Sequence, residues 1–301
     1  MKVSQQNHSL NGTNKNRKPE WLLKKVFFSQ KKEVEQSLKS IGIHTVCQEA
    51  MCPNISECFA KKQATFMLLG DTCTRACTFC NVHRGTPQNL DEEEPQKVAQ
   101  AVKALGLKHV VITSVTRDDL KDGGASVFVA ATKKIQEIDK NITIELLIPD
   151  LRLNLEALKS VALCGAQIVA HNIETVPRLY HIRKGANYQR SLDVLRFLKE
   201  SNPHIKTKSS LMLGLGETKE ELKESLNALL DVGCTLLTLG QYLAPSKSHE
   251  SVKEYIEPKR FEEFGQMALD MGFEFVKSSP YTRSSYMSHE YFERDKLQIS
   301  K

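Results

Sequence analysis

The stretch Cys73-Thr-Arg-Ala-Cys77-Thr-Phe-Cys80 places three cysteines at the spacing C-x3-C-x2-C, directly after an apolar run that ends at Gly70-Asp71. Three thiolates held close together bind a soft metal ion or an iron–sulfur cluster, because metal binding deprotonates the thiols. Structural zinc sites and ordinary electron-transfer clusters have four protein ligands. A site with three cysteines therefore leaves one iron of a cluster open to a further ligand. A zinc site completed by a nearby residue such as His83 is the alternative.

A second set of three cysteines lies just upstream at the spacing C-x4-C-x5-C, and it comprises Cys47, Cys52 and Cys58. Six of the eight cysteines of the chain therefore fall within residues 47–80. Two sets of three fit poorly with two zinc sites, because a structural zinc ion takes four protein ligands. Disulfide pairing requires an oxidising compartment, and clustered, unpaired thiols instead favour a reducing cytoplasm.

Both motifs, with the aromatic Phe79 before the last cysteine, resemble those of the lipoyl synthases, a family of the radical S-adenosylmethionine (SAM) enzymes. The resemblance covers most of the chain, from about Pro19 to Tyr286. It departs from the family pattern at Ser210 and Ser288, where glycine and alanine are common. The further stretches that carry it are HVVITSVTRDDLKDGGA (109–125), HNIETV (171–176), LMLGLGET (211–218), LTLGQYL (237–243) and RSSY (283–286).

The resemblance implies which cofactors the two cysteine sets hold. The set at 73–80 would bind a [4Fe-4S] cluster whose open iron chelates SAM. The set at 47–58 would bind an auxiliary [4Fe-4S] cluster that donates sulfur. The RSSY motif implies a serine as the fourth ligand of the auxiliary cluster, and we expect Ser285 rather than Ser284. Spacing does not decide between the two serines, and the alternative is that both hydroxyls only cap a turn or a helix start.

From Thr65 onward, short apolar runs alternate with amphipathic segments, which predicts parallel strands joined by right-handed crossovers. Six such units predict an open or partial barrel, although a doubly wound sheet gives the same alternation. The resemblance favours an α/β fold with a partial (βα)6 TIM-type barrel, flanked by N-terminal and C-terminal extensions that carry the auxiliary cluster. Strands are expected at 66–69, 110–113, 143–148, 168–172, 207–213, 236–239 and 273–277, and helices at 31–40, 94–105, 125–139, 154–163, 190–200, from Thr218 and at 258–271.

The predicted domain boundaries follow this alternation and the charge pattern. Residues 1–40 carry nine Lys or Arg and three Asp or Glu, whereas the net charge of the whole chain is +6, so the rest of the chain is balanced. Such a basic block is most often a solvated tail, and steering toward an acidic protein or a nucleic acid is the alternative. We expect a disordered basic arm at 1–18, an N-terminal extension with the auxiliary cysteines at 19–64, the partial barrel at 65–257 and a C-terminal extension with RSSY at 258–301.

Polar groups follow the ends of six consecutive predicted strands, and barrel enzymes carry their reactive groups at these ends. SAM offers an amine, a carboxylate and ribose hydroxyls. Asn172 and Glu174 suit its ribose or methionyl end, and Arg190 and Lys208 suit its carboxylate. Asp118, after the second strand, is a further predicted SAM contact. A helix-start carboxylate explains Glu174 about as well.

Three other residues are expected to be part of the core rather than ligands. His171 is expected to be a core histidine whose nitrogens are hydrogen-bonded. Cys164 and Cys234 lie among Ala, Leu, Val and Gly, which is typical of small buried residues.

The resemblance also implies the reaction and its partners. A radical SAM sulfurtransferase of this family inserts two sulfur atoms at C6 and C8 of an octanoyl group carried on a lysine of a lipoyl domain. The implied partners are octanoylated E2 subunits of 2-oxoacid dehydrogenases and the glycine cleavage H protein, a ferredoxin- or flavodoxin-type electron donor and an iron–sulfur carrier protein. Biotin synthase is the near alternative, and the C-x4-C-x5-C set argues against it.

A zinc or iron–sulfur protein that binds nucleic acid is the distant alternative. Such a protein needs basic residues along its folded surface, and the chain beyond residue 40 has balanced charge. We expect no membrane association, because no apolar run approaches the roughly 20 residues of a membrane span. The N-terminus lacks the apolar segment of a secretory signal, and its scarcity of arginine argues against a mitochondrial transit peptide.

Overall fold

The computed structural model describes residues 18–23, 35–36, 38–61 and 63–291. The predicted basic arm therefore lies outside the described residues except for Lys18. The described part of the helix expected at 31–40 is helical.

An eight-stranded sheet forms the centre of the fold, and its strand order is β1-β2-β5-β6-β7-β8-β9-β10. Every neighbouring pair is parallel except β1 and β2. The strands are β1 (His44–Thr45), β2 (Thr65–Leu68), β5 (His109–Ser114), β6 (Thr143–Leu147), β7 (Ile168–Ala170), β8 (Lys206–Leu213), β9 (Leu236–Gln241) and β10 (Phe275–Ser278).

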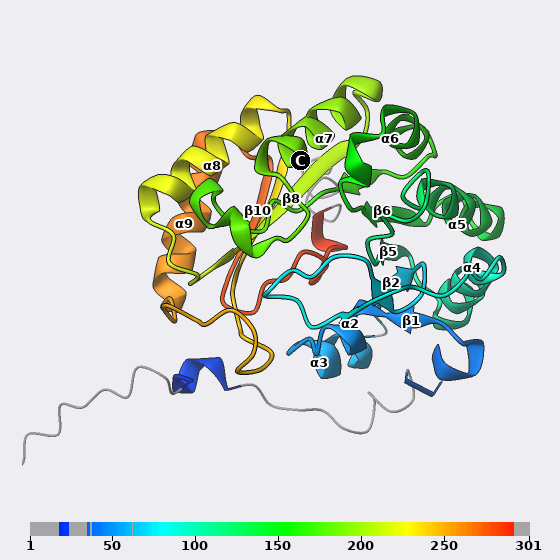
Figure 1. Cartoon of the computed structure of the whole chain (residues 1–301), viewed down its shortest axis with the longest axis horizontal. Helices are drawn as coiled ribbons and strands as arrows, with labels where there is room; N and C mark the ends of the chain where they lie inside the picture. The colour runs from blue at the N-terminus through cyan, green and yellow to red at the C-terminus, as the bar shows by residue number, and fades with distance from the viewer. Residues whose placement is uncertain (1–17, 24–34, 37, 62, 292–301) are drawn as a thin grey trace, which may run out of the picture.

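Helices follow the parallel strands and cover one face of the sheet, so that they form an outer layer around it (Figure 1). The main helices are α4 (Glu94–Leu105), α5 (Ala125–Ile138), α6 (Leu155–Ala162), α7 (Tyr188–Ser201), α8 (Lys219–Asp231) and α9 (Pro258–Met271). The shorter elements are η1 (Glu20–Leu22), α2 (Val46–Glu49), α3 (Ile55–Ala60), β3 (Thr72–Cys73), β4 (His83–Arg84), η2 (Leu151–Leu153) and η3 (Pro177–Ile182).

The strand order separates the two fold classes that the alternation left open. Successive parallel strands are spatial neighbours from β2 through β10, whereas a doubly wound sheet reverses direction partway. The two outermost strands are β1 and β10, so the sheet is an open barrel. The prediction of a partial TIM-type barrel is therefore confirmed.

The ends of the sheet differ from the predicted six-unit barrel. The two-residue strand β1 was not expected, because a segment this short has no readable alternation. The last strand, β10, pairs with β9 in parallel and extends the sheet. The predicted boundary between residues 257 and 258 therefore separates β10 from the rest of the sheet to which it belongs.

The two faces of the sheet carry different side chains. Val110 and Ile112 of β5 are buried in the cluster that includes Val98 and Val102 of α4, which is the apolar layer between sheet and helices. The alternate residues point to the inner face, since successive side chains of a strand face opposite sides. That inner face is polar in several places, as at Lys208 of β8.

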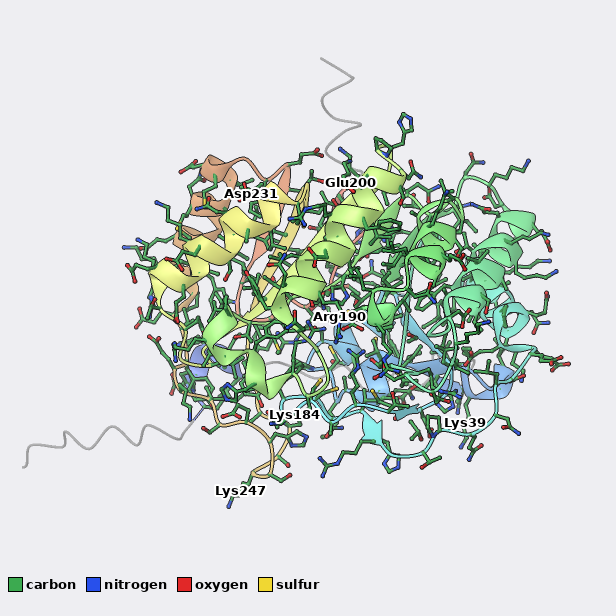
Figure 2. The ribbon with its side chains drawn as sticks, turned by 45° about the horizontal axis from the view of Figure 1, so that its top comes forward. Lys39, Lys184, Arg190, Glu200, Asp231 and Lys247 are labelled. Carbon is green, nitrogen blue, oxygen red and sulfur yellow. The ribbon has the colours of Figure 1, made fainter. Side chains whose placement is uncertain are left out.

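The helix ends show which end of the barrel can hold a site. Lys184 and Lys247 lie in loops at one end, and Glu200 and Asp231, in the last turns of α7 and α8, lie at the opposite end (Figure 2). Because each helix runs antiparallel to the strands, the first end is where the strands finish. Among the described residues, no helix has the length and apolar character needed to cross a membrane.

The capping box predicted at the start of α8 is present. Thr218 Oγ1 accepts from Glu221 N at 3.2 Å, and the Glu221 carboxylate accepts from Thr218 N at 2.8 Å. These two bonds satisfy amide groups that would otherwise lack a partner in the first turn.

Replacing Thr218 by alanine should destabilise the first turn of α8 by about 1 kcal/mol, because the cap bond to Glu221 N is lost. Hydrogen exchange followed by mass spectrometry measures this as faster exchange of the first α8 amides. Thr218→Ser keeps the hydroxyl and should exchange as the parent does. Equal protection in Thr218→Ala would show that the cap contributes nothing.

Candidate active site

The loop with the C-x3-C-x2-C motif begins at β3 and lies across the carboxyl end of the sheet. Thr74 N donates to Thr116 O beyond β5 at 2.9 Å, and Thr78 N donates to Ile182 O of η3 at 2.9 Å. The loop is thus held by segments from two different parts of the barrel. All three cysteines of the motif are partly exposed.

Arg75, between the first two cysteines of the motif, ties this loop to the barrel through two carboxylates, those of the buried Asp150 and the partly exposed Asp118. Its Nε and Nη2 donate to the two oxygens of Asp118 at 2.7 and 2.8 Å. Its Nη1 and Nη2 donate to the two oxygens of Asp150 at 2.9 and 2.7 Å. Only 6% of the Arg75 side chain is exposed, and the Asp150 side chain is fully buried. Bidentate pairs of this kind fix direction as well as distance.

Arg190 completes this ionic group. Its Nε donates to Asp150 Oδ2 at 2.8 Å, and its Nη2 donates to Gly185 O at 2.5 Å. Burial alone would raise the pKa of Asp150, but the bonds and charge of Arg75 hold it well below its usual range. Asp118 and Arg190 were predicted to contact SAM. In the structure Asp118 instead pairs with Arg75 and Arg190 pairs with Asp150, within the ionic group that holds the cysteine loop.

Lys208 is also engaged elsewhere. It is fully buried on β8, where its Nζ donates to Glu145 Oε1 at 2.6 Å and to Ser284 O at 2.5 Å. A fully buried ammonium between these two acceptors is not open to a ligand. The prediction that Lys208 meets the SAM carboxylate is therefore not supported.

Asn172 and Glu174 follow β7 and contact each other. Asn172 Nδ2 donates to Glu174 Oε1 at 3.0 Å. Burial raises the pKa of Glu174, and the charge of Arg183 opposes this effect. The backbone of Glu174 has a φ of +65° and bridges to Leu211 of β8. The first turn of η3 contains no acidic residue, so the alternative of a helix-start carboxylate is wrong.

Arg183, which sequence reasoning missed, brings positive charge to the cysteine loop. Burial raises the pKa of the Cys77 thiol, and Arg183 is the cation that most strongly opposes this effect. Its Nη1 donates to Ser191 Oγ at 3.1 Å and to the Tyr180 hydroxyl. Arg183 follows η3 rather than a strand, so an argument from strand ends could not find it.

His171 and Cys234 are core residues as expected, whereas the expectation that Cys164 is buried is wrong. Both ring nitrogens of His171 are hydrogen-bonded, Nδ1 with Ile148 O at 2.9 Å and Nε2 with Ser191 Oγ at 3.0 Å. Burial lowers its pKa to about 4, so it is neutral at physiological pH. Cys234 is buried, and Cys164 is partly exposed.

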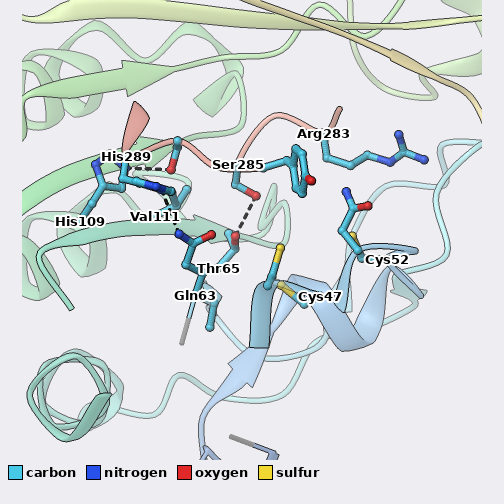
Figure 3. Close-up of a pocket in the computed structure, with 14 residues that line it drawn as sticks. Cys47, Cys52, Gln63, Thr65, His109, Val111, Arg283, Ser285 and His289 are labelled. Atoms are coloured by element: carbon cyan, nitrogen blue, oxygen red, sulfur yellow. Dashed lines mark hydrogen bonds between the residues drawn. The ribbon is translucent and has the colours of Figure 1, made fainter. Parts of the chain in front are cut away.

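The second cysteine set and Ser285 line one pocket (Figure 3). Cys47 is on α2, Cys58 is on α3, and Cys52 lies between these helices. Thr65 Oγ1 of β2 donates to Ser285 Oγ at 2.8 Å. Burial raises the pKa of Cys47 to about 12, while hydrogen bonds from Thr65 oppose the rise. The Cys47 thiol is thus protonated until metal binding displaces its proton.

Hydrogen bonds between distant segments close this pocket. Asn54 Nδ2 donates to Tyr281 O at 2.7 Å, and the Tyr286 hydroxyl donates to Glu57 Oε1 at 3.0 Å. Gln63 Nε2 lies 2.9 Å from His289 Nδ1. We call residues 281–289 the C-terminal strap. The strap brings Ser285 to cysteines that precede it by more than 220 residues.

The neighbouring serine has a different environment. Ser284 Oγ donates to Asn172 Oδ1 at 3.0 Å, and Ser284 O accepts from Lys208. The two hydroxyls therefore face different parts of the barrel, and the one that lines the cysteine pocket belongs to Ser285. This placement supports the choice of Ser285.

His83, the residue expected to complete a zinc site in the alternative interpretation, is exposed on β4. Within the part of the chain that the structure describes, no three His, Cys, Asp or Glu side chains converge closely enough to hold one metal ion. In an iron–sulfur cluster each thiolate binds a different iron atom.

Comparison with known proteins identifies the family. Residues 67–229 match the Radical SAM superfamily. The curated lipoyl synthase of Geotalea daltonii is 52% identical over 275 residues, which cover 91% of this chain and 94% of that protein. The lipoyl synthase of Caldicellulosiruptor saccharolyticus is 52% identical over 276 residues, which cover 91% of this chain and 97% of that protein. The chain belongs to the lipoyl synthase family.

Membership of this family implies a radical SAM enzyme that uses a [4Fe-4S] cluster and SAM. It favours lipoyl synthase over biotin synthase and over the nucleic-acid-binding alternative.

Solved structures agree on the fold alone. HydG from Carboxydothermus hydrogenoformans superposes with a TM-score of 0.55 at 12% identity and covers 88% of this chain and 79% of its own. Methylornithine synthase (PylB) superposes with a TM-score of 0.51 at 15% identity and covers 73% of each chain.

Asp150→Asn should lower the free energy of unfolding by about 3–5 kcal/mol relative to the parent, because Arg75 and Arg190 lose a buried counter-charge. It should also lower the iron bound at residues 73–80, measured in a variant with Cys47, Cys52 and Cys58 replaced by alanine. The folded-state pKa of Asp150 is depressed. Its contribution is therefore present above about pH 4 and is lost as the pH falls through the folded pKa.

Asp193→Asn is the control for this experiment, since Asp193 pairs with Arg196 on the surface of α7, where the two side chains are 32% and 45% exposed. The control should retain iron and stability near the parent values. If Asp150→Asn matches the control in both measurements, Asp150 does not hold the loop.

Proposed function

We propose that this chain inserts two sulfur atoms, at C6 and C8, into an octanoyl group carried on a lysine of a lipoyl domain. The observation that carries the proposal is the pair of three-cysteine sets in one folded body, in a chain of the lipoyl synthase family. When bound, the first cluster and SAM supply a 5′-deoxyadenosyl radical that removes hydrogen from the octanoyl chain, and the auxiliary cluster supplies sulfide. The protein's share is positioning, charge and the exclusion of water.

Cys73, Cys77 and Cys80 hold the cluster that binds SAM in this proposal. The open iron needs a loop that stays in place while SAM binds and leaves. Arg75 meets this need, because its buried pairs with Asp118 and Asp150 join the loop to two barrel strands. Asp118 then acts on SAM through the loop, and not by direct contact.

Asn172, Glu174 and Arg183 are the side chains that we propose for SAM itself. Asn172 and Glu174 are within hydrogen-bond distance of each other, and both lie after β7, at the end of the barrel that carries the cysteine loop. The Glu174 carboxylate suits the methionyl amine or the ribose hydroxyls. Arg183 replaces Arg190 and Lys208 as the partner of the SAM carboxylate, since its charge acts on both Cys77 and Glu174.

The auxiliary cluster is held by Cys47, Cys52, Cys58 and Ser285 in this proposal. An alkoxide oxygen is a harder donor than a thiolate and matches iron less well. Such a ligand suits a cluster that gives up sulfide, because one iron can be released as the sulfur is attacked. Thr65 supports the exchange, since its hydroxyl donates to Ser285 Oγ.

The partners follow from the chemistry of the reaction. The substrates are octanoylated lipoyl domains, such as those of 2-oxoacid dehydrogenase E2 subunits and the glycine cleavage H protein. A ferredoxin or flavodoxin supplies electrons, and an iron–sulfur carrier protein restores the auxiliary cluster. Clustered thiols and reduced clusters suit the cytoplasm.

The decisive assay supplies SAM, a reductant and an octanoylated lipoyl domain, and weighs the product by mass spectrometry. Cys77→Ala should lose both 5′-deoxyadenosine formation and the lipoyl product. Cys52→Ala should still form 5′-deoxyadenosine but insert no sulfur, since radical generation and sulfur donation are separate. A full turnover of lipoyl product by Cys52→Ala would exclude the auxiliary set as the sulfur source.

Ser285→Ala should bind and cleave SAM but form little lipoyl product, because the auxiliary cluster lacks its fourth ligand. Ser285→Cys should hold the cluster and donate sulfur poorly, since thiolate releases iron less readily than an oxygen donor. The assay is the same mass measurement with 5′-deoxyadenosine counted in parallel.

Ser284→Ala is the control, because it removes a hydroxyl that bonds Asn172 and leaves the Ser284 carbonyl in place. If this control loses sulfur insertion while Ser285→Ala retains it, the ligand is Ser284. If neither loses it, the fourth ligand is another group.

A further inference from the structure

A fully buried lysine contacts the C-terminal strap from the inner face of the barrel. Among the described residues, three groups contact the Lys208 ammonium. They are the Glu145 carboxylate at 2.6 Å, the Ser284 carbonyl at 2.5 Å and the Tyr291 ring, whose centroid lies 4.4 Å away. Two of these groups belong to the segment 284–291, which also carries Ser285.

Stability alone does not account for this arrangement. Removing an ammonium and a carboxylate from water costs several kcal/mol each, and an apolar pair of similar volume is often as stable. The Lys208 and Glu145 side chains are both fully buried. A buried ion pair of this kind is better explained by the position that it gives a neighbouring group. Here the Lys208 ammonium fixes the position of the Ser284 carbonyl.

The Ser284 peptide is fixed from two strands. Lys208 on β8 holds its carbonyl, and Asn172 after β7 accepts from its hydroxyl at 3.0 Å. The Ser284 carbonyl belongs to the peptide unit that also contains the Ser285 amide. Because a peptide unit is planar, holding this oxygen fixes where the Ser285 N and Cα lie, and the side chain leaves the backbone from this Cα.

We propose that Lys208 is a positioning residue that holds the Ser284 peptide and so directs Ser285 Oγ into the pocket of Cys47, Cys52 and Cys58. The inference rests on the proposed role of Ser285 as a ligand of the auxiliary cluster. Lys208 touches neither cluster nor substrate, and it acts through the backbone of the strap. A ligand that must leave iron and return needs such an anchor, because its own bond to iron is the weak one.

The test uses the full chain with Cys73, Cys77 and Cys80 replaced by alanine, so that only the auxiliary cluster is loaded. Mild oxidation removes the iron that has the weakest protein ligand and leaves a [3Fe-4S] cluster, which electron paramagnetic resonance detects. The rate of this conversion reports how well Ser285 holds its iron, and it does not depend on turnover.

The central variant is Lys208→Met combined with Glu145→Met, which removes both members of the buried pair at nearly constant volume, so that neither is left without the other. Loss of a group that orients a metal ligand weakens metal binding by about 10–100-fold. We expect conversion about 10-fold faster than in the parent, close to the rate of Ser285→Ala.

Two further variants separate positioning from damage to the fold. Ser279→Ala removes the bond between Ser279 Oγ and Thr282 Oγ1, 2.8 Å long, which holds the same strap outside the pocket. It should convert at the parent rate. Adding Ser285→Cys to the double methionine variant should restore slow conversion, since a thiolate binds iron without help from the anchor.

The outcomes separate the two proposals. If the double methionine variant converts at the parent rate while Ser285→Ala is fast, Ser285 is a ligand and Lys208 does not position it. If Ser285→Ala itself converts at the parent rate, Ser285 is not the ligand and the inference falls with it. If Ser285→Cys fails to restore slow conversion, the loss of Lys208 has damaged the pocket as a whole, which also overturns the positioning role.

Discussion

The double ion pair of Arg75 is the interaction on which the geometry of the site depends. Arg75 lies within the cysteine loop, whereas its partners Asp118 and Asp150 follow β5 and β6. Because the guanidinium is buried, moving the loop would separate it from both carboxylates, and an unpaired buried charge is costly. The loop therefore has one low-energy position, although it has little regular structure of its own.

Much of the fold follows from hydrophobic periodicity. The expected helices at 94–105 and 258–271 coincide with α4 and α9, because apolar residues at helical spacing mark the face that packs on the sheet. The short β1 was missed, and the strand β10 was expected but not placed in the main sheet. Periodicity describes what an element buries and does not say which neighbour it pairs with.

The two cysteine sets were predicted from their spacing, and Ser285 was predicted from the family resemblance. The partners of the charged residues were not predicted, because an argument from strand ends gives a side chain's location but not its partner. Arg190 and Lys208 were assigned to a ligand, yet each has a buried carboxylate as its partner. A signal for the second pair was available, since Glu145 interrupts an otherwise apolar strand and a buried charge calls for an opposite one.

The strap also fixes the order in which the protein can mature. A ribosome delivers residues 47 to 80 early, so all six clustered cysteines emerge long before Ser285. The loop at 73–80 has its Arg75 partners by residue 150 and its bond to Ile182 soon after, but the pocket of Cys47, Cys52 and Cys58 lacks one wall until the strap beyond β10 has folded. An incomplete or truncated chain thus lacks the wall of this pocket that Ser285 supplies.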